Sequence, residues 1–284
     1  MEKIPLSINI KGRLLDFRKP KVMAIINVTP DSFYSGSRGD TAGRIKEIVS
    51  DAIEEGADIL DVGGCSTRPG SEAPTPAEEY DRLCRGLEII KAMAPECIVS
   101  IDTWRAEVAR KCVEEWEADI INDIGFGRLD PDMFETVADL DVPYILTHSR
   151  GTPSTMDKEA SYEDVTAEVL TEFSKAIYEL RDKKVKDIIL DPGFGFAKTV
   201  EQNFKLLAEL DEICKIGLPV MAALSRKSMI RKTLGCDADS ALGGTIALNA
   251  IAVEKGANIL RVHDVKAAVE TVKLHQALKN QKDD

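Results

Sequence analysis

Short apolar runs alternate along this chain with longer segments in which apolar residues recur every three to four positions. The short runs are typical of strands buried in a parallel sheet, and the longer period is typical of amphipathic helices. The expected strands are 22–28, 59–63, 98–102, 120–124, 144–148, 188–191, 220–224 and 259–263. The expected helices are 43–55, 76–93, 106–116, 131–140, 162–183, 200–209, 241–255 and 265–278.

Eight strands alternating with eight helices predict an α/β fold, a (β/α)8 barrel of the TIM type. A doubly wound open sheet is the alternative, but no G-x-G-x-x-G follows the first strand. Residues 6–10 and 14–17 flank Lys11-Gly12 and predict a short N-terminal β-hairpin that covers the bottom of the barrel. Because no linker or low-complexity stretch interrupts the pattern, we expect residues 1–284 to form one barrel domain.

Composition narrows the class of partner. The net charge is 37 − 49 = −12, which argues against nucleic acid and against an anionic membrane surface. The six cysteines include no C-x-x-C pair, so neither a zinc site nor a disulfide framework is indicated, and a reducing cytoplasm is expected. No apolar run approaches the ~20 residues of a membrane span, and the N-terminus lacks a signal-peptide core.

Polar residues stand at or near the carboxyl end of almost every expected strand. They are Asn27, Asp61, Asp102, Asn122, Asp123, His148, Asp191, Lys227, Arg261 and His263. The carboxyl ends of barrel strands meet at one face, where barrel enzymes place their active sites. An aspartate there can also be a helix N-cap, which is what we expect of Asp61 and Asp123, and His148 is expected to be structural. The coincidence across so many strands nevertheless predicts a binding site.

The charges at these strand ends suggest a ligand with two unlike ends. Acceptors suited to a heterocycle with N–H donors are Asp102, Asn122 and Asp191. Cations and donors suited to a diphosphate are Lys227, Arg261 and His263. Neutral oxygens suited to phosphate or Mg²⁺ are those of Asn27 and Thr67. The expected ligand therefore joins a polar aromatic ring to an anion.

Three loops complete the expected site. Residues 29–40 and 63–71 are longer than ordinary connections and are expected to close over substrate. In 191–196, two glycines allow a close backbone approach, while Phe194 can offer a stacking face or belong to the core. Cys65 lies in the second loop, but without a surrounding cationic triad it is not expected to act as a nucleophile.

Seven motifs stand in order at these strand ends. They are 27–33 (NVTPDSF), 61–70 (DVGGCSTRPG), 100–103 (SIDT), 121–124 (INDI), 191–196 (DPGFGF), 225–228 (SRKS) and 261–264 (RVHD). With these motifs the chain resembles, over nearly its whole length, the dihydropteroate synthases, pterin-binding enzymes of folate biosynthesis that sulfonamides target. It departs from their common pattern at Cys65, Trp104, Ser149 and Ala197, the last of which stands where many members have Gly.

The resemblance implies condensation of (7,8-dihydropterin-6-yl)methyl diphosphate with p-aminobenzoate, with Mg²⁺ as cofactor and a homodimer as the assembly. The implied pterin pocket is Asp102, Asn122, Asp191 and Lys227. The implied diphosphate pocket is Asn27, Thr67, Arg261 and His263, with Asn27 also meeting Mg²⁺. The implied p-aminobenzoate side is Thr67, Arg68, Pro69, Phe33, Phe194 and Ser228. The catalytic residues that the resemblance implies are Lys227, Asp191 and Arg68.

A pterin ring can stabilise a methylene cation, so loss of diphosphate by an SN1-like route is expected, with no protein nucleophile. Three other functions stay open. A methyltetrahydrofolate:corrinoid methyltransferase would share the ring acceptors but has no need for Arg68, Arg261 and His263. A Schiff-base aldolase would use Lys227, which lies outside the usual mid-barrel position. A catalytically inactive pterin-binding protein would not need the cations.

Overall fold

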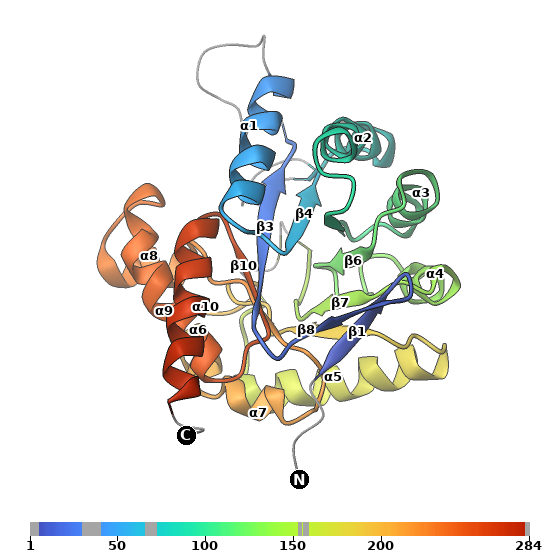
Figure 1. Cartoon of the computed structure of the whole chain (residues 1–284). Coiled ribbons are helices and arrows are strands. Elements are labelled where there is room, and N and C mark those ends of the chain that lie inside the picture. Colours follow the sequence, from blue (N-terminus) through green and yellow to red (C-terminus); the bar gives the residue numbers. More distant parts are fainter. Residues whose placement is uncertain (1–5, 30–40, 66–72, 153–154, 156–158, 282–284) are drawn as a thin grey trace.

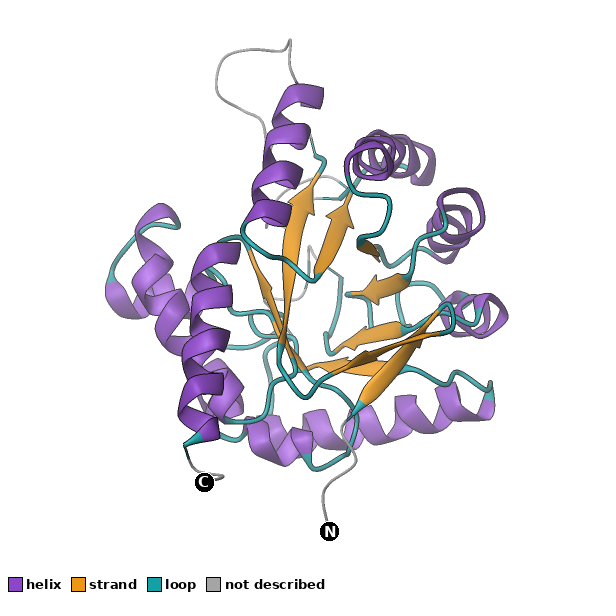
Figure 2. Ribbon diagram, in the orientation of Figure 1, coloured by secondary structure: helices purple, strands orange, loops and turns teal. Residues whose placement is uncertain are grey.

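The computed structural model shows a ring of parallel strands surrounded by helices (Figures 1 and 2). It describes residues 6–29, 41–65, 73–152, 155 and 159–281. The barrel strands are β3 (Lys21–Asn27), β4 (Ile59–Gly63), β5 (Ile98–Asp102), β6 (Ile120–Asp123), β7 (Tyr144–Thr147), β8 (Ile188–Asp191), β9 (Met221–Ala222) and β10 (Ile259–Val262).

Helices follow the strands around the outside of this ring. They are α1 (Thr41–Glu54), α2 (Pro76–Met93), α3 (Ala106–Trp116), α4 (Met133–Leu140), α5 (Val165–Asp182), α6 (Val200–Ala208), α7 (Leu210–Cys214), α8 (Ser228–Leu234), the 3₁₀ turn η3 (Asp239–Ala241), α9 (Leu242–Glu254) and α10 (Val265–Asn280). Within the described residues, no helix is long and apolar enough to cross a membrane.

The strand order shows that the sheet closes. Neighbouring strands run β8-β7-β6-β5-β4-β3-β10-β9, all parallel. A parallel bridge between Leu190 and Val220 joins the two ends of this order. The predicted (β/α)8 barrel is therefore confirmed, and the open doubly wound sheet is excluded.

Two elements near the seventh strand differ from the prediction. Strand β9 has two residues where 220–224 were expected, since Ala223 and Leu224 stay buried but leave the ladder. Helix α8 was not predicted, because seven residues are too few to show a helical period. It begins after Lys227 and ends at Gly235, whose φ of +64° closes the helix in the left-handed region.

Alternate residues of each strand face opposite sides of the barrel wall. The outward set, which includes Val22, Leu60, Val99 and Leu190, packs with the helices in the main core. The inward set forms a second cluster at the amino ends of the strands: Met23, Ile59, Ile120, Ile145, Ile189, Met221 and Ile259. Burying one such side chain stabilises the fold by about 1.5–3 kcal/mol.

The predicted hairpin covers this lower cluster. Strands β1 (Ser7–Ile10) and β2 (Arg13–Asp16) pair antiparallel around Lys11-Gly12, and both turn residues have positive φ, +48° and +86°. That is the turn whose twist suits a two-residue hairpin. Ile8, Ile10 and Phe17 pack on the inward apolar residues, so the bottom of the barrel is closed.

Candidate active site

The inward-facing positions change from apolar to polar towards the carboxyl ends of the strands. Two residues beyond the apolar layer, the same faces carry Asp61 on β4, Ser100 on β5, Asn122 on β6, Thr147 on β7, Asp191 on β8 and Arg261 on β10. The period of two that fills the lower barrel with isoleucine thus fills the upper barrel with hydrogen-bonding groups. Because these groups are buried, they need partners inside the mouth.

Arg261 lies at the centre of this polar layer. Its Nε donates to Asp61 Oδ2 at 2.7 Å, and its Nη2 donates to Asp102 Oδ2 at 2.5 Å. The same Asp61 oxygen accepts from Asn122 Nδ2 at 3.0 Å. The structure therefore brings together Asp102, Asn122 and Arg261, which the sequence had assigned to opposite ends of the ligand.

The expectation that Asp61 caps a helix is wrong. The residue is fully buried and holds Arg261 and Asn122 across the barrel, and its Oδ1 has no partner among the described residues. Oδ1 of Asn122 also lacks a partner there. Two buried acceptors without donors, side by side, are suited to a ligand that presents N–H groups. Strand alternation, which puts Asp61 on the same face as Ile59, is the sequence signal for this position.

Asp123 does not cap a helix as expected, because α4 begins only at Met133; it holds the turn after β6. Its two carboxylate oxygens accept from the backbone N–H of Gly125 and of Gly127, both at 2.6 Å. Tyr144 donates its hydroxyl to the same carboxylate at 2.6 Å. Asp123 therefore holds the turn after β6 and does not face the polar layer.

Asp191 and Lys227 form the charged wall opposite β4 and β5. Asp191 is 3% exposed, and its Oδ1 accepts from Gly193 N at 2.8 Å. The Lys227 ammonium lies 4.5 Å from the centre of the Phe196 ring. Burial raises the pKa of Asp191 and lowers the pKa of Lys227 to about 8, while each charge opposes the shift of the other. The pair is placed to meet a polar ring with one acceptor and one cation.

For Asp102 and Arg261 as well, burial disfavours the charged form and a neighbouring opposite charge favours it. Burial raises the pKa of Asp102 to about 7, and the guanidinium of Arg261 opposes that rise. Burial disfavours the Arg261 cation, but Asp61 and Asp102 outweigh it and raise the pKa of Arg261. The guanidinium is therefore a fixed positive charge in the mouth, whereas Asp102 and Lys227 can change their protonation with pH.

His263 stands at the rim of the mouth. Its Nδ1 lies 3.0 Å from Ser225 Oγ, and its own backbone N–H donates to that oxygen at 3.2 Å. Because Ser225 already accepts the backbone proton, its hydroxyl can donate to Nδ1, which leaves Nε2–H as a donor. Desolvation in the concave site lowers the pKa of His263, and the positive charges of Arg261 and Arg226 lower it further. Part of the residue is nevertheless exposed at the rim.

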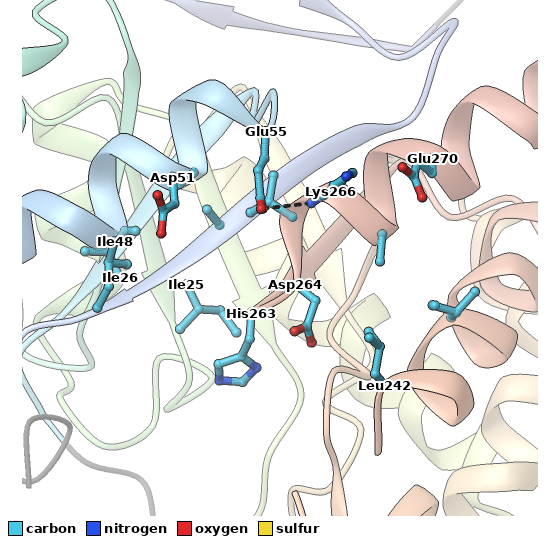
Figure 3. A pocket seen from close by; sticks show the side chains of 15 residues that line it. Ile25, Ile26, Ile48, Asp51, Glu55, Leu242, His263, Asp264, Lys266 and Glu270 are labelled. Atoms are coloured by element: carbon cyan, nitrogen blue, oxygen red, sulfur yellow. Dashed lines mark hydrogen bonds between the residues drawn. The ribbon is translucent and has the colours of Figure 1, made fainter. Parts of the chain in front are cut away.

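A separate hollow of about 510 Å³ is lined by β3, α1, α9, α10 and the link between β10 and α10. Figure 3 shows His263 among the side chains that line this hollow. The charged groups around the hollow, apart from His263, are Asp51, Glu55, Asp264, Glu270 and Lys266. Four carboxylates against one lysine do not suit a diphosphate. An anion is therefore expected on the mouth side of His263, where Arg261 and Lys227 lie.

The loop before α8 is held on the same rim. Arg226 pairs with Asp264 through two hydrogen bonds of 3.1 and 2.7 Å, and its own φ is +57°. The pairing fixes the backbone from which Lys227 and Ser228 extend. Ser228, the first residue of α8, is partly exposed next to Lys227, at the side expected for p-aminobenzoate.

Asn27 ends β3 beside this polar layer. A Cβ added at Gly63 would lie 3.5 Å from Asn27 Oδ1 and 3.6 Å from the Asp102 Cβ, so Gly63 keeps the space between the two side chains open. Within the described residues, no three carboxylate, histidine or cysteine side chains form a metal site. Mg²⁺ is commonly held by one or two protein oxygens together with substrate phosphates, and the amide oxygen of Asn27 fits that role.

One residue predicted for the p-aminobenzoate side, Phe194, is placed differently from the prediction, and four others are not described. Phe194 is fully buried in the main core and offers no open stacking face, whereas Phe196 is the ring that meets Lys227. Phe33, Thr67, Arg68 and Pro69 lie outside the described residues, as does most of both long loops. Their predicted contacts with p-aminobenzoate and diphosphate remain predictions.

Comparison with known proteins gives one consistent family. The model of the pterin binding enzymes matches residues 23–263. A dihydropteroate synthase of Haemophilus influenzae is 39% identical over 95% of this chain and 98% of its own length. A Xanthomonas albilineans dihydropteroate synthase with 4-aminobenzoic acid has a TM-score of 0.90 at 37% identity, covering 97% of this chain and 99% of that chain. The Xanthomonas enzyme in complex with 7,8-dihydropteroate has a TM-score of 0.86 at 35% identity, covering 96% and 98%.

Proposed function

This chain belongs to the dihydropteroate synthases of the pterin-binding enzyme family, and we propose that its barrel mouth joins (7,8-dihydropterin-6-yl)methyl diphosphate to p-aminobenzoate. The products are 7,8-dihydropteroate and diphosphate, so the enzyme transfers a pterinylmethyl group in folate biosynthesis. The observation that carries this function is the meeting, in one mouth, of buried acceptors without donors and of two cations, Lys227 and Arg261.

The pterin ring would lie against the acceptor side of the mouth. Its guanidine-like edge presents parallel N–H groups, which a carboxylate takes as a pair. Asp191 offers a carboxylate whose orientation Gly193 fixes, and Asn122 and Asp61 offer oxygens that have no partner among the described residues. Asp102 completes this side once the ring competes for Arg261. Residues on four strands would thus hold the ring.

The diphosphate would lie at the rim. Arg261 supplies a permanent charge, His263 an Nε2–H donor, and Lys227 a cation next to the ring. We propose that Mg²⁺ is bound there by Asn27 together with the diphosphate oxygens. The ion, when bound, neutralises charge on the leaving group. Thr67 is proposed to contact the diphosphate from the loop after β4.

The bond that breaks joins the pterin methylene carbon to a diphosphate oxygen, and the electron pair leaves with the oxygen. The resulting cation is delocalised into the ring that Asp191 and Asn122 hold. The p-aminobenzoate nitrogen then donates its electron pair to the carbon, and the proton that it loses passes to the released diphosphate or to water. Arg68, Pro69, Phe33 and Ser228 are proposed to frame this amine. The residues act by holding charges in place, which is commonly the largest single contribution to catalysis.

The other functions weighed from the sequence are not favoured. The relatives that match over most of this chain are synthases, whereas a corrinoid methyltransferase would leave the cations at the rim without a use. A Schiff-base aldolase would need Lys227 to be reached by a carbonyl carbon. Lys227 instead lies at the N-terminus of α8, over the Phe196 ring. If borohydride traps no adduct on Lys227 in the presence of a carbonyl substrate, this reaction is excluded.

We also propose a homodimer formed through α9. Helix α9 is apolar around its circumference, and its exposed positions include Leu242, Ile246 and Ile251, which are 39%, 38% and 44% exposed; Leu234 at the end of α8 is 58% exposed. A helix that is apolar on all sides is normally covered. A second copy of the chain is the occupant that the same apolar face would suit. Ile251→Glu should convert a dimer into a monomer in sedimentation, and Leu14→Glu on the hairpin should not.

Residues 1–284 are proposed to act as one pterin-binding domain in the cytoplasm. The hairpin packs inside the lower barrel, so it is part of the same core. The described residues contain no disulfide, which suits a reducing compartment.

The test of the function is an assay of diphosphate release with each substrate alone and with both. We expect release only with both substrates and Mg²⁺, together with an equal amount of dihydropteroate. Release with the pterin substrate alone at the full rate would contradict the condensation. Full activity in excess chelator would contradict only the proposed cofactor.

A further inference from the structure

One cation near the mouth has no part in the chemistry described above. Lys198 follows the 192–197 loop that connects β8 to α6, and its ammonium is surrounded by acceptors. Nζ lies 3.0 Å from Gly193 O, 3.1 Å from Phe196 O and 3.1 Å from His148 Nδ1. An ammonium has three N–H donors, which the three shorter contacts use, and the carbonyl oxygen of His148 lies farther from Nζ, at 3.4 Å.

The acceptors come from two loops that touch each other. His148 follows β7, and a Cβ added at Gly193 would lie only 1.9 Å from the His148 carbonyl oxygen. The loop after β8 turns through left-handed conformations at Gly193, Gly195 and Ala197, with φ of +70°, +82° and +47°. The carbonyls of Gly193 and Phe196 both accept from the Lys198 ammonium, and Gly193 O also accepts from Phe196 N at 3.0 Å. Ala197 adopts this conformation without the freedom of glycine.

This loop also supports both charged residues of the pterin wall. Gly193 donates its N–H to Asp191, and a Cβ at Gly195 would lie 3.2 Å from Lys227 Cδ. Phe196 places its ring under the Lys227 ammonium. A change in the path of the loop would therefore move the Asp191 carboxylate and the Lys227 amine together.

We propose that Lys198 is a positioning residue for the pterin site, whose ammonium clamps the β8–α6 loop onto the end of β7 and thereby orients Asp191 and Lys227. The inference rests on the proposed binding of the pterin ring by these two residues. Lys198 itself contacts neither substrate. Its loss should weaken pterin binding more than p-aminobenzoate binding.

The charges around the clamp support this assignment. Burial and the charge of Lys198 lower the pKa of His148 to about 4, so the imidazole is neutral and Nδ1 can accept. Desolvation lowers the pKa of Lys198 to about 7; Asp191 and Glu172 favour the cation, and Arg150 and Lys227 oppose it. Below pH 7 the clamp has three donors. Above it the neutral amine has two for the same three acceptors, so the clamp weakens as pH rises.

The test compares Lys198→Met and Lys198→Gln with wild type and with Lys205→Gln. Lys205 lies on α6, pairs with Asp164 at 2.7 Å and faces solvent, so it controls for the loss of one lysine charge from this region of the chain. Kinetics give KM for each substrate and kcat, and calorimetry gives the Kd of the pterin diphosphate. Because a displacement of about 1 Å can lower activity on the order of 10²-fold, we expect Lys198→Met to raise the pterin KM and Kd by about 10- to 100-fold. The p-aminobenzoate KM should change less than about threefold.

The pH dependence of pterin binding distinguishes a positioning role of the Lys198 charge from a merely structural role of its side chain. The ratio of variant to wild-type Kd cancels the titration of Asp102 and Lys227, which both proteins keep. We expect this ratio to be largest at pH 6 and to fall at least threefold by pH 8.5. A ratio that does not change with pH, or equal increases in both KM values, would overturn the proposal. So would a pterin Kd in folded Lys198→Gln within twofold of wild type; wild-type protein without condensation activity would instead overturn the proposed function.

Discussion

The two ends of the barrel are built from the same strands, and the residues that distinguish them lie only two positions apart on each strand. On β8, Ile189 points into the closed lower cluster, and Asp191 points into the mouth. On β10, Ile259 and Arg261 make the same pair. The side chains of the lower layer are apolar, pack against one another and are covered by the hairpin, so they need no ligand. Among the described residues, the upper layer contains buried acceptors that no donor reaches, and burial raises the pKa of its carboxylates Asp102 and Asp191. This layer is therefore suited to a ligand that supplies donors.

The difference separates stability from function along a single strand. Apolar burial at the bottom offsets the unfavourable burial of charges at the top. Substitutions in the two layers should therefore have opposite signatures, and matched pairs on one strand can break or sharpen this comparison.

Asp191→Ala is expected to have the largest effect on activity. The ring would lose two charge-assisted hydrogen bonds of about 1.5–3 kcal/mol each, so kcat/KM should fall by roughly 10²- to 10⁴-fold. The melting temperature should not fall, because a carboxylate whose pKa is raised by burial is unfavourable in the folded state. Lys227→Ala should also lower activity strongly. Unchanged kcat/KM in both variants would remove these residues from the site.

Asp61→Asn tests the residue that the sequence misassigned. Asparagine keeps the shape but loses the charge that holds Arg261 Nε, so kcat/KM for the pterin diphosphate should fall by about 10- to 100-fold. Asp123→Asn is the matched control, because Asp123 holds only a turn and Tyr144. If Asp61→Asn kept full activity and a normal pterin KM, the central role of the Arg261 cluster would be wrong.

The pH dependence should follow Lys227. Its pKa of about 8 means that the amine is charged below pH 8 and neutral above it. Since the substrate is an anion, kcat/KM for the pterin diphosphate should decrease as pH rises through about 8, by roughly tenfold. Lys227→Arg keeps its charge and should lose most of this limb, measured from pH 7 to pH 9.5 at constant ionic strength, and should keep only the roughly threefold decrease that deprotonation of Lys198 contributes. A limb that persists at its full size in the arginine variant belongs to another group.

Ile189→Ala is expected to have the smallest effect on activity and a large effect on stability. Deletion of a buried isoleucine side chain destabilises by about 2–5 kcal/mol, which denaturant unfolding would measure. Both KM values should stay within about twofold of wild type, because the lower cluster lies below the polar layer. A loss of pterin binding comparable to that of Asp191→Ala would show that the two layers are not separate.

Most of the fold could be predicted from sequence because barrel strands are continuous apolar runs followed by polar residues. The hairpin was likewise indicated by its Lys11-Gly12 turn. What failed was local: α8 is too short for a period, and Ala223-Leu224 are apolar without being in the ladder.

The convergence of polar side chains at the mouth could be predicted from sequence, whereas their hydrogen-bond partners could not. Asp102, Asn122, Asp191 and Arg261 were found as strand ends. Asp61 was missed because capping and inward-facing aspartates look alike unless strand alternation is followed. Lys198 could not be singled out, since its partners are mainly backbone carbonyls, which no side-chain pattern shows. Whether Phe194 or Phe196 faces the site depends on burial, which only the folded chain decides.

The central claim is that the upper layer stabilises departure of the diphosphate without a protein nucleophile or base. Positional isotope exchange tests it most directly. Pterin diphosphate that carries ¹⁸O at the oxygen between the methylene carbon and the first phosphorus is incubated with enzyme and Mg²⁺ in the absence of p-aminobenzoate. We expect the label to move to non-bridging positions, because the bond ionises and reforms, and to move much more slowly in Asp191→Ala. No exchange by an enzyme that makes dihydropteroate at its normal rate would contradict the ionising route.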